Sequence, residues 1–271
     1  MMDAARATPE SPCIGIFDSG VGGLSVLQAL LDAAPPAHAP RLVYVADSGH
    51  APYGERDDDF VKQRALAIAG FLRAQGAALI VVACNTATAL AVEALRRVYA
   101  DLAIVGVEPG LKPAAAATRN GRIGVLATAA TLRSARFRAL AHAHAGSHAL
   151  HLQACPGLAQ AIESGDIDGP AVRQLVQQFC EPLHAAQVDT VVLGCTHYPF
   201  VARHLQAALG SAVALIDTAP AVARQALKLC PGAAPASSAA LELFSSGDKS
   251  HLAAIASRWL GRPCRADVLT V

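Results

Sequence analysis

The fold is decided by two similar stretches, Ala78-Leu79-Ile80-Val81-Val82-Ala83-Cys84-Asn85-Thr86 and Thr190-Val191-Val192-Leu193-Gly194-Cys195-Thr196-His197. Each begins with a short apolar run that is rich in β-branched residues, a pattern typical of a buried parallel strand. Each run ends at a cysteine, and a helical pattern follows. Cys84 and Cys195 are therefore predicted to lie where the carboxyl end of a strand meets the amino end of a helix. In open α/β sheets, ligands bind at that edge.

The position of the two thiols indicates their chemistry. A helix amino end favours negative charge, so we expect it to lower the pKa of a thiol placed there. Two such thiols suit a reaction in which one thiolate removes a proton and the opposing thiol returns one. Two alternatives stay open: Cys84 and Cys195 can be inert core residues, or they can be ligands of a zinc ion with His197 as a third ligand.

The similarity extends beyond the cysteines. Ile14-Gly15-Ile16-Phe17 resembles Ile123-Gly124-Val125-Leu126 at an offset of 109 residues (14 to 123), and Cys84 matches Cys195 at an offset of 111 (84 to 195). A nearly constant offset over two strand–helix units predicts that an α/β half has been duplicated. The predicted fold is therefore two similar parallel-sheet, flavodoxin-like α/β domains related by pseudo-symmetry. The active site is expected in the cleft between them.

Strand and helix patterns alternate along the chain until Glu108-Pro109-Gly110 interrupts them. We expect residues 1–108 together with 218–271 to form the first α/β domain, which carries Cys84. Residues 109–217 are expected to form the second domain, which carries the other thiol.

Several elements are expected inside these domains. The periodicity predicts one helix over 132–145 and another over 200–209. Residues 231–240 are rich in proline, alanine and serine and are expected to form a loop. A last pair of strands is expected around 241–245 and 266–269.

The composition describes a globular chain with a large core. Of 271 residues, 53% are hydrophobic and 16% are charged, and the net charge of +1 provides no electrostatic footprint for nucleic acid or a membrane surface. The amino-terminal segment lacks the apolar core of a signal peptide, and no apolar run is long enough to span a membrane. Seven cysteines without short paired spacings argue against a disulfide framework. We therefore expect a cytoplasmic protein.

The segment Asp18-Ser19-Gly20-Val21-Gly22-Gly23 is a second candidate for ligand binding. Its glycines let backbone amides approach a ligand, and the dipole of the following helix favours an anion such as a carboxylate. The segment matches neither the dinucleotide-binding nor the P-loop pattern, so no nucleotide cofactor is indicated. A purely structural turn capped by Asp18 or Ser19 is the alternative.

Taken together, the motifs resemble the glutamate racemases, a family of cofactor-independent amino-acid racemases, and they run in the order of that family over nearly the whole chain. The main motifs are Asp18-Ser19-Gly20-Val21-Gly22-Gly23, Ala46-Asp47-Ser48, Pro52-Tyr53-Gly54, Ala83-Cys84-Asn85-Thr86, Gly106-Val107-Glu108-Pro109, Leu126-Ala127-Thr128 and Leu193-Gly194-Cys195-Thr196-His197-Tyr198-Pro199.

The resemblance implies a role for each matching residue. Cys84 and Cys195 would be the two bases on opposite faces of the substrate's α-carbon, interconverting L-glutamate and D-glutamate. Asp18 would assist Cys84, and Glu163 and His197 would assist Cys195. The residues implied to hold the substrate's amino and carboxylate groups are Asp18, Ser19, Tyr53, Gly54, Asn85, Thr86, Thr196 and His197, with Thr128 and Thr131 as further candidates.

The resemblance also implies that no cofactor and no metal is needed, and that the D-glutamate supplies peptidoglycan synthesis. The lysines agree with this, because none of them lies in a strand-end motif where a Schiff base to pyridoxal phosphate would be expected. The expected partner is a small-molecule substrate; nucleic acid and membrane are not expected, and a homodimer is compatible with the sequence. An aspartate or hydantoin racemase and a non-catalytic amino-acid-binding protein are the alternatives.

Overall fold

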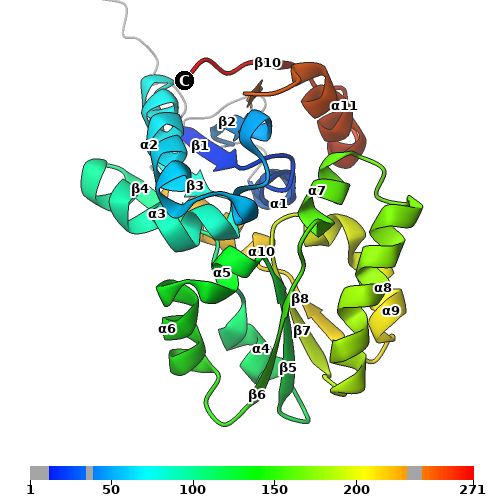
Figure 1. The fold of residues 1–271 in the computed structure, drawn as a ribbon. Helices are drawn as coiled ribbons and strands as arrows, with labels where there is room; N and C mark the ends of the chain where they lie inside the picture. The colour runs from blue at the N-terminus through cyan, green and yellow to red at the C-terminus, as the bar shows by residue number, and fades with distance from the viewer. Residues whose placement is uncertain (1–11, 35–38, 231–239) are drawn as a thin grey trace, which may run out of the picture.

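The computed structural model describes residues 12–34, 39–230 and 240–271, and it contains two parallel sheets (Figure 1). The six-stranded sheet has the order β10-β9-β2-β1-β3-β4, and the four-stranded sheet has the order β6-β5-β7-β8. The strands of the first are β1 (Cys13–Asp18), β2 (Arg41–Ala46), β3 (Ala77–Val82), β4 (Ala103–Gly106), β9 (Leu241–Ser245) and β10 (Ala266–Val268). Those of the second are β5 (Arg122–Ala127), β6 (Ala149–Ala154), β7 (Thr190–Gly194) and β8 (Ala214–Ile216).

Helices cover both sheets, and the predicted fold of two parallel-sheet α/β domains is confirmed (Figure 1). The helices of the first domain are α1 (Leu24–Ala33), α2 (Asp58–Ala74), α3 (Asn85–Val98), α10 (Ala219–Leu229) and α11 (Lys249–Leu260). Those of the second are α4 (Leu111–Ala117), α5 (Ala129–Arg133), α6 (Ala135–His144), α7 (Leu158–Glu163), α8 (Pro170–Ala185) and α9 (Ala202–Leu209). Short 3₁₀ turns are η2 (Ser48–His50), η3 (Tyr53–Glu55) and η4 (Tyr198–Val201).

Four strands of the first sheet have the same order as the four strands of the second sheet, which supports an internal duplication. In the first, β1 lies between β2 and β3, and β4 follows β3; in the second, β5 lies between β6 and β7, and β8 follows β7. All of these pairs are parallel. Each thiol follows the strand that occupies the same place in its sheet, so the topology brings both to a sheet's carboxyl edge.

The end of the chain returns to the first sheet. β9 pairs with β2, and β10 pairs with β9, so both expected carboxy-terminal strands form there. We propose the domain limits inferred from the sequence, 1–108 with 218–271 and 109–217, on the ground that this division separates the strands of the two sheets. Most of the predicted loop at 231–240 lies outside the described residues.

Two expected helices differ from the structure. The helix expected over 132–145 is two helices, because the backbone of Ser134 is extended and its hydroxyl accepts the Phe137 amide at 3.0 Å, capping α6. The helix expected over 200–209 begins only at Ala202, because the chain first makes the turn η4. Helices α4 and α11 were not predicted.

One apolar core crosses the boundary between the domains. The cluster includes Leu24 and Leu27 of α1, Leu158 of α7 and Tyr198 of η4, all fully buried. Burial of apolar surface therefore holds the two halves together near the carboxyl edges of their sheets. No helix of the described residues has the length and apolar character needed to cross a membrane.

The carboxylate of Asp189 anchors the start of β7, the strand that leads to Cys195. It accepts hydrogen bonds from the Thr118 hydroxyl at 2.6 Å, from the amides of Arg119 and Asn120 at 2.7 and 2.8 Å, and from the Thr190 hydroxyl at 3.0 Å. Burial raises the pKa of this carboxyl, but these hydrogen bonds outweigh it and lower the pKa to about 2.

We expect the substitution Asp189→Asn to reduce the free energy of unfolding by about 1–2 kcal/mol at neutral pH, because one amide group cannot accept every bond that the carboxylate accepts. The folded pKa of about 2 lies below the unfolded value of about 3.9, so the carboxylate stabilises the fold above about pH 4. The difference between the two proteins should shrink as the pH falls from there toward 2. Urea unfolding followed by circular dichroism measures it, with Asp32→Asn on exposed α1 surface as the control; an equal loss in both variants contradicts the assignment.

Candidate active site

Cys84 and Cys195 line one cavity between the domains, as the sequence predicted. Its empty volume is about 260 Å³, part of it open to solvent. Asp18, Glu163 and Thr131 do not line it but contact residues that do. The remaining walls are formed by Ser19, Pro52, Tyr53, Gly54, Asn85, Thr86, Thr128, Ala159, Thr196 and His197.

The thiol of Cys84 caps helix α3. Its sulfur accepts the amide of Ala87 at 3.4 Å, and its S–H donates to the Ser19 hydroxyl at 3.8 Å. Burial raises the pKa of Cys84 well above its usual value, and the charge of Asp18 raises it further; the bond from Ala87 offsets only part. The sequence-based expectation of a lowered pKa is therefore wrong for Cys84, because burial outweighs the effect of the helix end.

The thiol of Cys195 has a different environment. Its sulfur lies 3.6 Å from Nδ1 of His197, and Nε2 of that ring contacts Oε1 of Glu163. Burial lowers the pKa of His197, but its bonds to Cys195 and Glu163 outweigh this and hold the pKa well above its usual value. The ring is therefore protonated and donates from both nitrogens, so Cys195 lies beside a buried cation.

Glu163 joins this group to the loop that precedes α1. Its Oε1 also accepts the amide of Val21 at 2.7 Å. In the structure, a carboxylate of the second domain thus bonds the glycine-rich loop at which the sequence predicted a ligand anion. The glycines are required by close approach: a Cβ atom at Gly20 would overlap the Glu163 carboxylate, and one at Gly22 would overlap the ring of His197.

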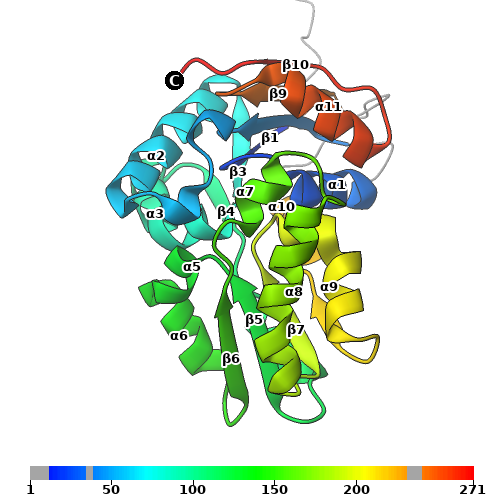
Figure 2. The same cartoon turned by 45° about the vertical axis from the view of Figure 1, so that its right-hand side comes forward.

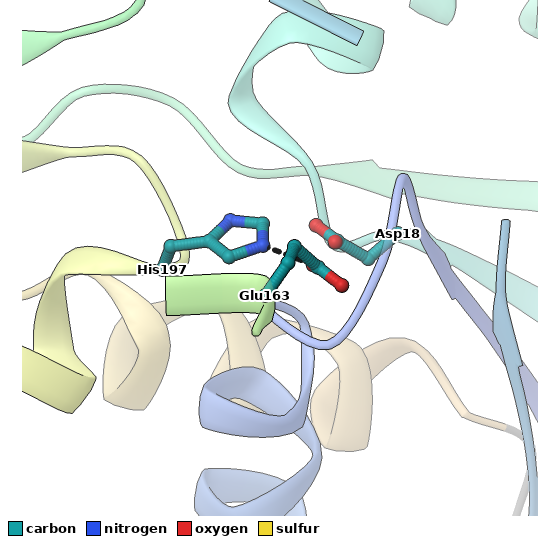
Figure 3. Close-up of side chains that lie close together, drawn as sticks. All are labelled: Asp18, Glu163 and His197. Atoms are coloured by element: carbon teal, nitrogen blue, oxygen red, sulfur yellow. Dashed lines mark hydrogen bonds and ion pairs between the residues drawn. The ribbon is translucent and has the colours of Figure 1, made fainter. Parts of the chain in front are cut away.

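Asp18 lies beside Glu163 and His197, and the three side chains form one cluster (Figure 3). One of its oxygens accepts the Gly20 amide at 2.7 Å, and the other accepts the Thr196 hydroxyl at 2.9 Å. Burial raises the pKa of Asp18 to about 6, although the nearby His197 lowers it in part.

The three side chains of Figure 3 are of types that ligate metals, and their ligand atoms lie within 4.8 Å of one another. Both ring nitrogens of His197 are already engaged, with Cys195 and with Glu163. The ring therefore has no free lone pair for a cation. The bonding fits a network that holds and moves protons.

Polar groups on the cavity wall suit an amino acid. The Oδ1 atom of Asn85 is buried and has no hydrogen-bond partner in the described part of the chain, so it can accept from an ammonium group. The hydroxyls of Thr86, Thr128 and Thr131 lie within 2.9–3.5 Å of one another. Together with Ser19, they offer donors for carboxylates.

Sequence reasoning missed the support behind Tyr53. Its hydroxyl donates to buried Asp47 at 2.5 Å, and Arg64 donates to both oxygens of the same carboxylate at 3.0 and 2.8 Å. Asp47 directly follows β2 in the motif Ala46-Asp47-Ser48, and this position was a signal that could have identified it. Arg64 lies in α2 and carries no such signal. Pro52 and Ala159 were also not predicted to line the cavity.

Comparisons with known proteins agree with this geometry. The sequence profile of the family described as Asp/Glu/hydantoin racemase matches residues 14–226. The chain is 53% identical over 233 residues to a glutamate racemase of Pseudomonas syringae pv. tomato, covering 84% of each chain. Its fold is similar to that of a glutamate racemase isoform of Bacillus anthracis, with a TM-score of 0.86 and 31% identity over 96% of this chain and 98% of that one. It is also similar to Escherichia coli glutamate racemase in complex with L-glutamate and the activator UDP-MurNAc-Ala, with a TM-score of 0.83 and 30% identity over 96% and 99%.

The contribution of Asp18 to the raised pKa of Cys84 can be measured by substitution. Because the charge of Asp18 raises the pKa of Cys84, Asp18→Asn should lower that pKa and accelerate alkylation of Cys84 at any pH above about 6, where Asp18 is ionised. Each unit of decrease raises the thiolate fraction about tenfold. Iodoacetamide labelling read by peptide mass spectrometry measures the rate, with Cys230 as internal reference and Asp32→Asn as control. Unchanged labelling of Cys84 would refute the coupling.

Proposed function

The chain belongs to the Asp/Glu/hydantoin racemase family as a glutamate racemase, and we propose that it interconverts L-glutamate and D-glutamate by moving the α-proton between Cys84 and Cys195. The observation that carries this mechanism is the placement of both thiols on one cavity, each supplied by a different α/β half. A planar carbanion held between them receives its proton from either face, and the face decides the enantiomer.

The proton transfer uses the thiols as a matched pair. One sulfur, as thiolate, takes the α-proton of one enantiomer and becomes a thiol; the opposing thiol gives its proton to the carbanion and becomes a thiolate. The α-proton of an amino acid is only weakly acidic, so a strong base is needed. The raised pKa of Cys84 makes its thiolate such a base, although the thiolate is rarely populated before substrate binds.

The neighbours of each thiol assist it differently. The protonated ring of His197 stabilises the Cys195 thiolate, and Glu163 keeps that ring protonated. Asp18 assists Cys84 through its negative charge, which strengthens the base. These are the roles that the family resemblance implies for the three side chains.

Fixed hydrogen-bond donors stabilise the carbanion in this proposal. Among the described residues, none that lines the cavity is Lys or Arg. The first turn of α3 presents the amides of Asn85 and Thr86 to a carboxylate, and the hydroxyl of Ser19 adds a donor. Fixed donors in a buried site are stronger than the same groups in water, so this route needs no pyridoxal phosphate and no metal.

The physiological role rests on family membership. We propose that the D-glutamate is used for peptidoglycan synthesis in the cytoplasm, and that glutamate is the only partner this site requires; a homodimer remains compatible with it. Aspartate is the competing substrate, because an aspartate racemase would use the same two thiols. Glutamate is favoured because the relatives with about half of their residues identical are glutamate racemases.

Chiral chromatography of purified protein with single enantiomers tests the activity. We expect L-glutamate and D-glutamate each to approach a racemic mixture, and L-aspartate to stay unchanged. Activity should survive dialysis against EDTA and treatment with hydroxylamine, which remove metals and pyridoxal phosphate. Racemisation of aspartate alone would refute the substrate, and recovery of a dialysed, inactive sample by zinc would refute the metal-free mechanism.

A second experiment tests the two-base mechanism. Cys84→Ala and Cys195→Ala should each abolish racemisation, because the carbanion then lacks either its base or its proton donor. Each variant should still eliminate halide from one enantiomer of a halogenated glutamate, since elimination needs only one base. The variants should prefer opposite enantiomers, and Cys264→Ala serves as the control. Two-way racemisation by either active-site variant would exclude the assignment.

A further inference from the structure

Helix α11 reaches from the first domain to the Cys195 side of the site. It follows β9 in the six-stranded sheet, and in both views it lies next to α7 and the segment that leads to α8 (Figures 1 and 2). The two polar contacts that it makes with this segment are both side chain to backbone. They involve His251 and Arg258 of α11.

These contacts hold the end of α7, where Glu163 is the last helical residue. Nε2 of His251 lies 2.6 Å from the backbone oxygen of Glu163; since a carbonyl only accepts, this nitrogen carries the proton. The guanidinium of Arg258 donates to the backbone oxygen of Gly165 at 3.0 Å. α7 has only six residues, and so short a helix depends on tertiary contacts for its position.

Helix α11 also contacts the segment that follows His197. The ring of Trp259 stacks on Phe200, with centroids 3.9 Å apart and planes inclined by 24°. Phe200 lies in η4, directly after the loop that carries His197. Ile255 of α11 and Ile162 of α7 belong to the core cluster that fills the space between. One helix therefore contacts the segments that carry both partners of the Glu163–His197 hydrogen bond.

We propose that His251 and Arg258 are positioning residues for the Cys195 base: α11 holds the Glu163 backbone where its carboxylate can bond His197. This inference rests on the proposed racemase function. The Cys84 side is held by other groups, because its sulfur bonds Ala87 and Ser19 and none of these lies on α11. Loss of the α11 contacts should therefore impair one of the two proton transfers and spare the other.

The difference between the two proton transfers can be measured from the reaction in its two directions. The equilibrium constant between enantiomers is one, so kcat/KM falls equally in both directions whichever thiol is impaired. The primary deuterium isotope effects do differ. When transfer at Cys195 becomes slower, the isotope effect rises for the α-deuterated enantiomer that Cys195 deprotonates. It falls for the other enantiomer, whose deprotonation by Cys84 then becomes reversible.

The experiment measures isotope effects on kcat/KM with L- and D-[2-²H]glutamate. We expect His251→Ala to lower kcat/KM about tenfold, as a small misplacement of a catalytic group does. The isotope effects should move in opposite directions for the two enantiomers, in the same sense as in His197→Asn and in the reverse sense to Asp18→Asn. His251→Gln keeps a donor near the Nε2 position and should restore most of the lost rate.

Lys249→Ala, at an exposed position of α11, is the matched control and should resemble the unsubstituted protein. Arg258→Ala carries the same test if His251→Ala does not fold. An unchanged kcat/KM would overturn the proposal, and so would a loss of rate without opposite changes in the isotope effects or without rescue by glutamine. An unsubstituted protein without racemase activity would overturn the proposed function as well, so the two failures are distinguishable.

Discussion

The carboxylate of Glu163 joins the two α/β halves of the molecule through hydrogen bonds. It accepts a bond from the amide of Val21 in one domain and contacts His197 in the other. A carboxylate that is largely withdrawn from water, as this one is with 14% of its side chain exposed, is costly unless it is paired, and the loop before α1 and the loop after β7 both approach it. This approach requires glycine at Gly20 and Gly22, and it brings the strand ends that carry the thiols to a common cavity.

The two halves keep the same strand order and the same thiol position, but the neighbours of the thiols have diverged. Asp18 ends β1, whereas Ala127 ends the equivalent strand β5. His197 follows its cysteine by two residues, and Thr86 stands at the equivalent place in the first half. One thiol therefore has an anion beside it and the other a cation. The site is therefore symmetric in the strand order around the two thiols and asymmetric in the charges beside them.

The features that were predictable from sequence are those encoded locally. The strand-end position of Cys84 and Cys195 follows from a few adjacent residues and a topological rule, and the structure confirms it. The pKa of Cys84 was predicted in the wrong direction, because the helix end is visible in the sequence whereas burial and the approach of Asp18 are not. The contact of His251 with Glu163 joins residues 88 positions apart and has no local pattern at either end.

The strand order also sets when the strands of each sheet become available as the chain leaves the ribosome. All strands of the second sheet are synthesised before β9 and β10, which the first sheet needs beside β2. During elongation the second domain can therefore complete its sheet while β2 exposes an open edge, a period in which a nascent chain is prone to associate with others. Because α11 lies between β9 and β10, the residues that contact the Glu163 backbone are synthesised only after every strand of the second sheet. The groups that we propose to position Cys195 are therefore synthesised after Cys195 itself.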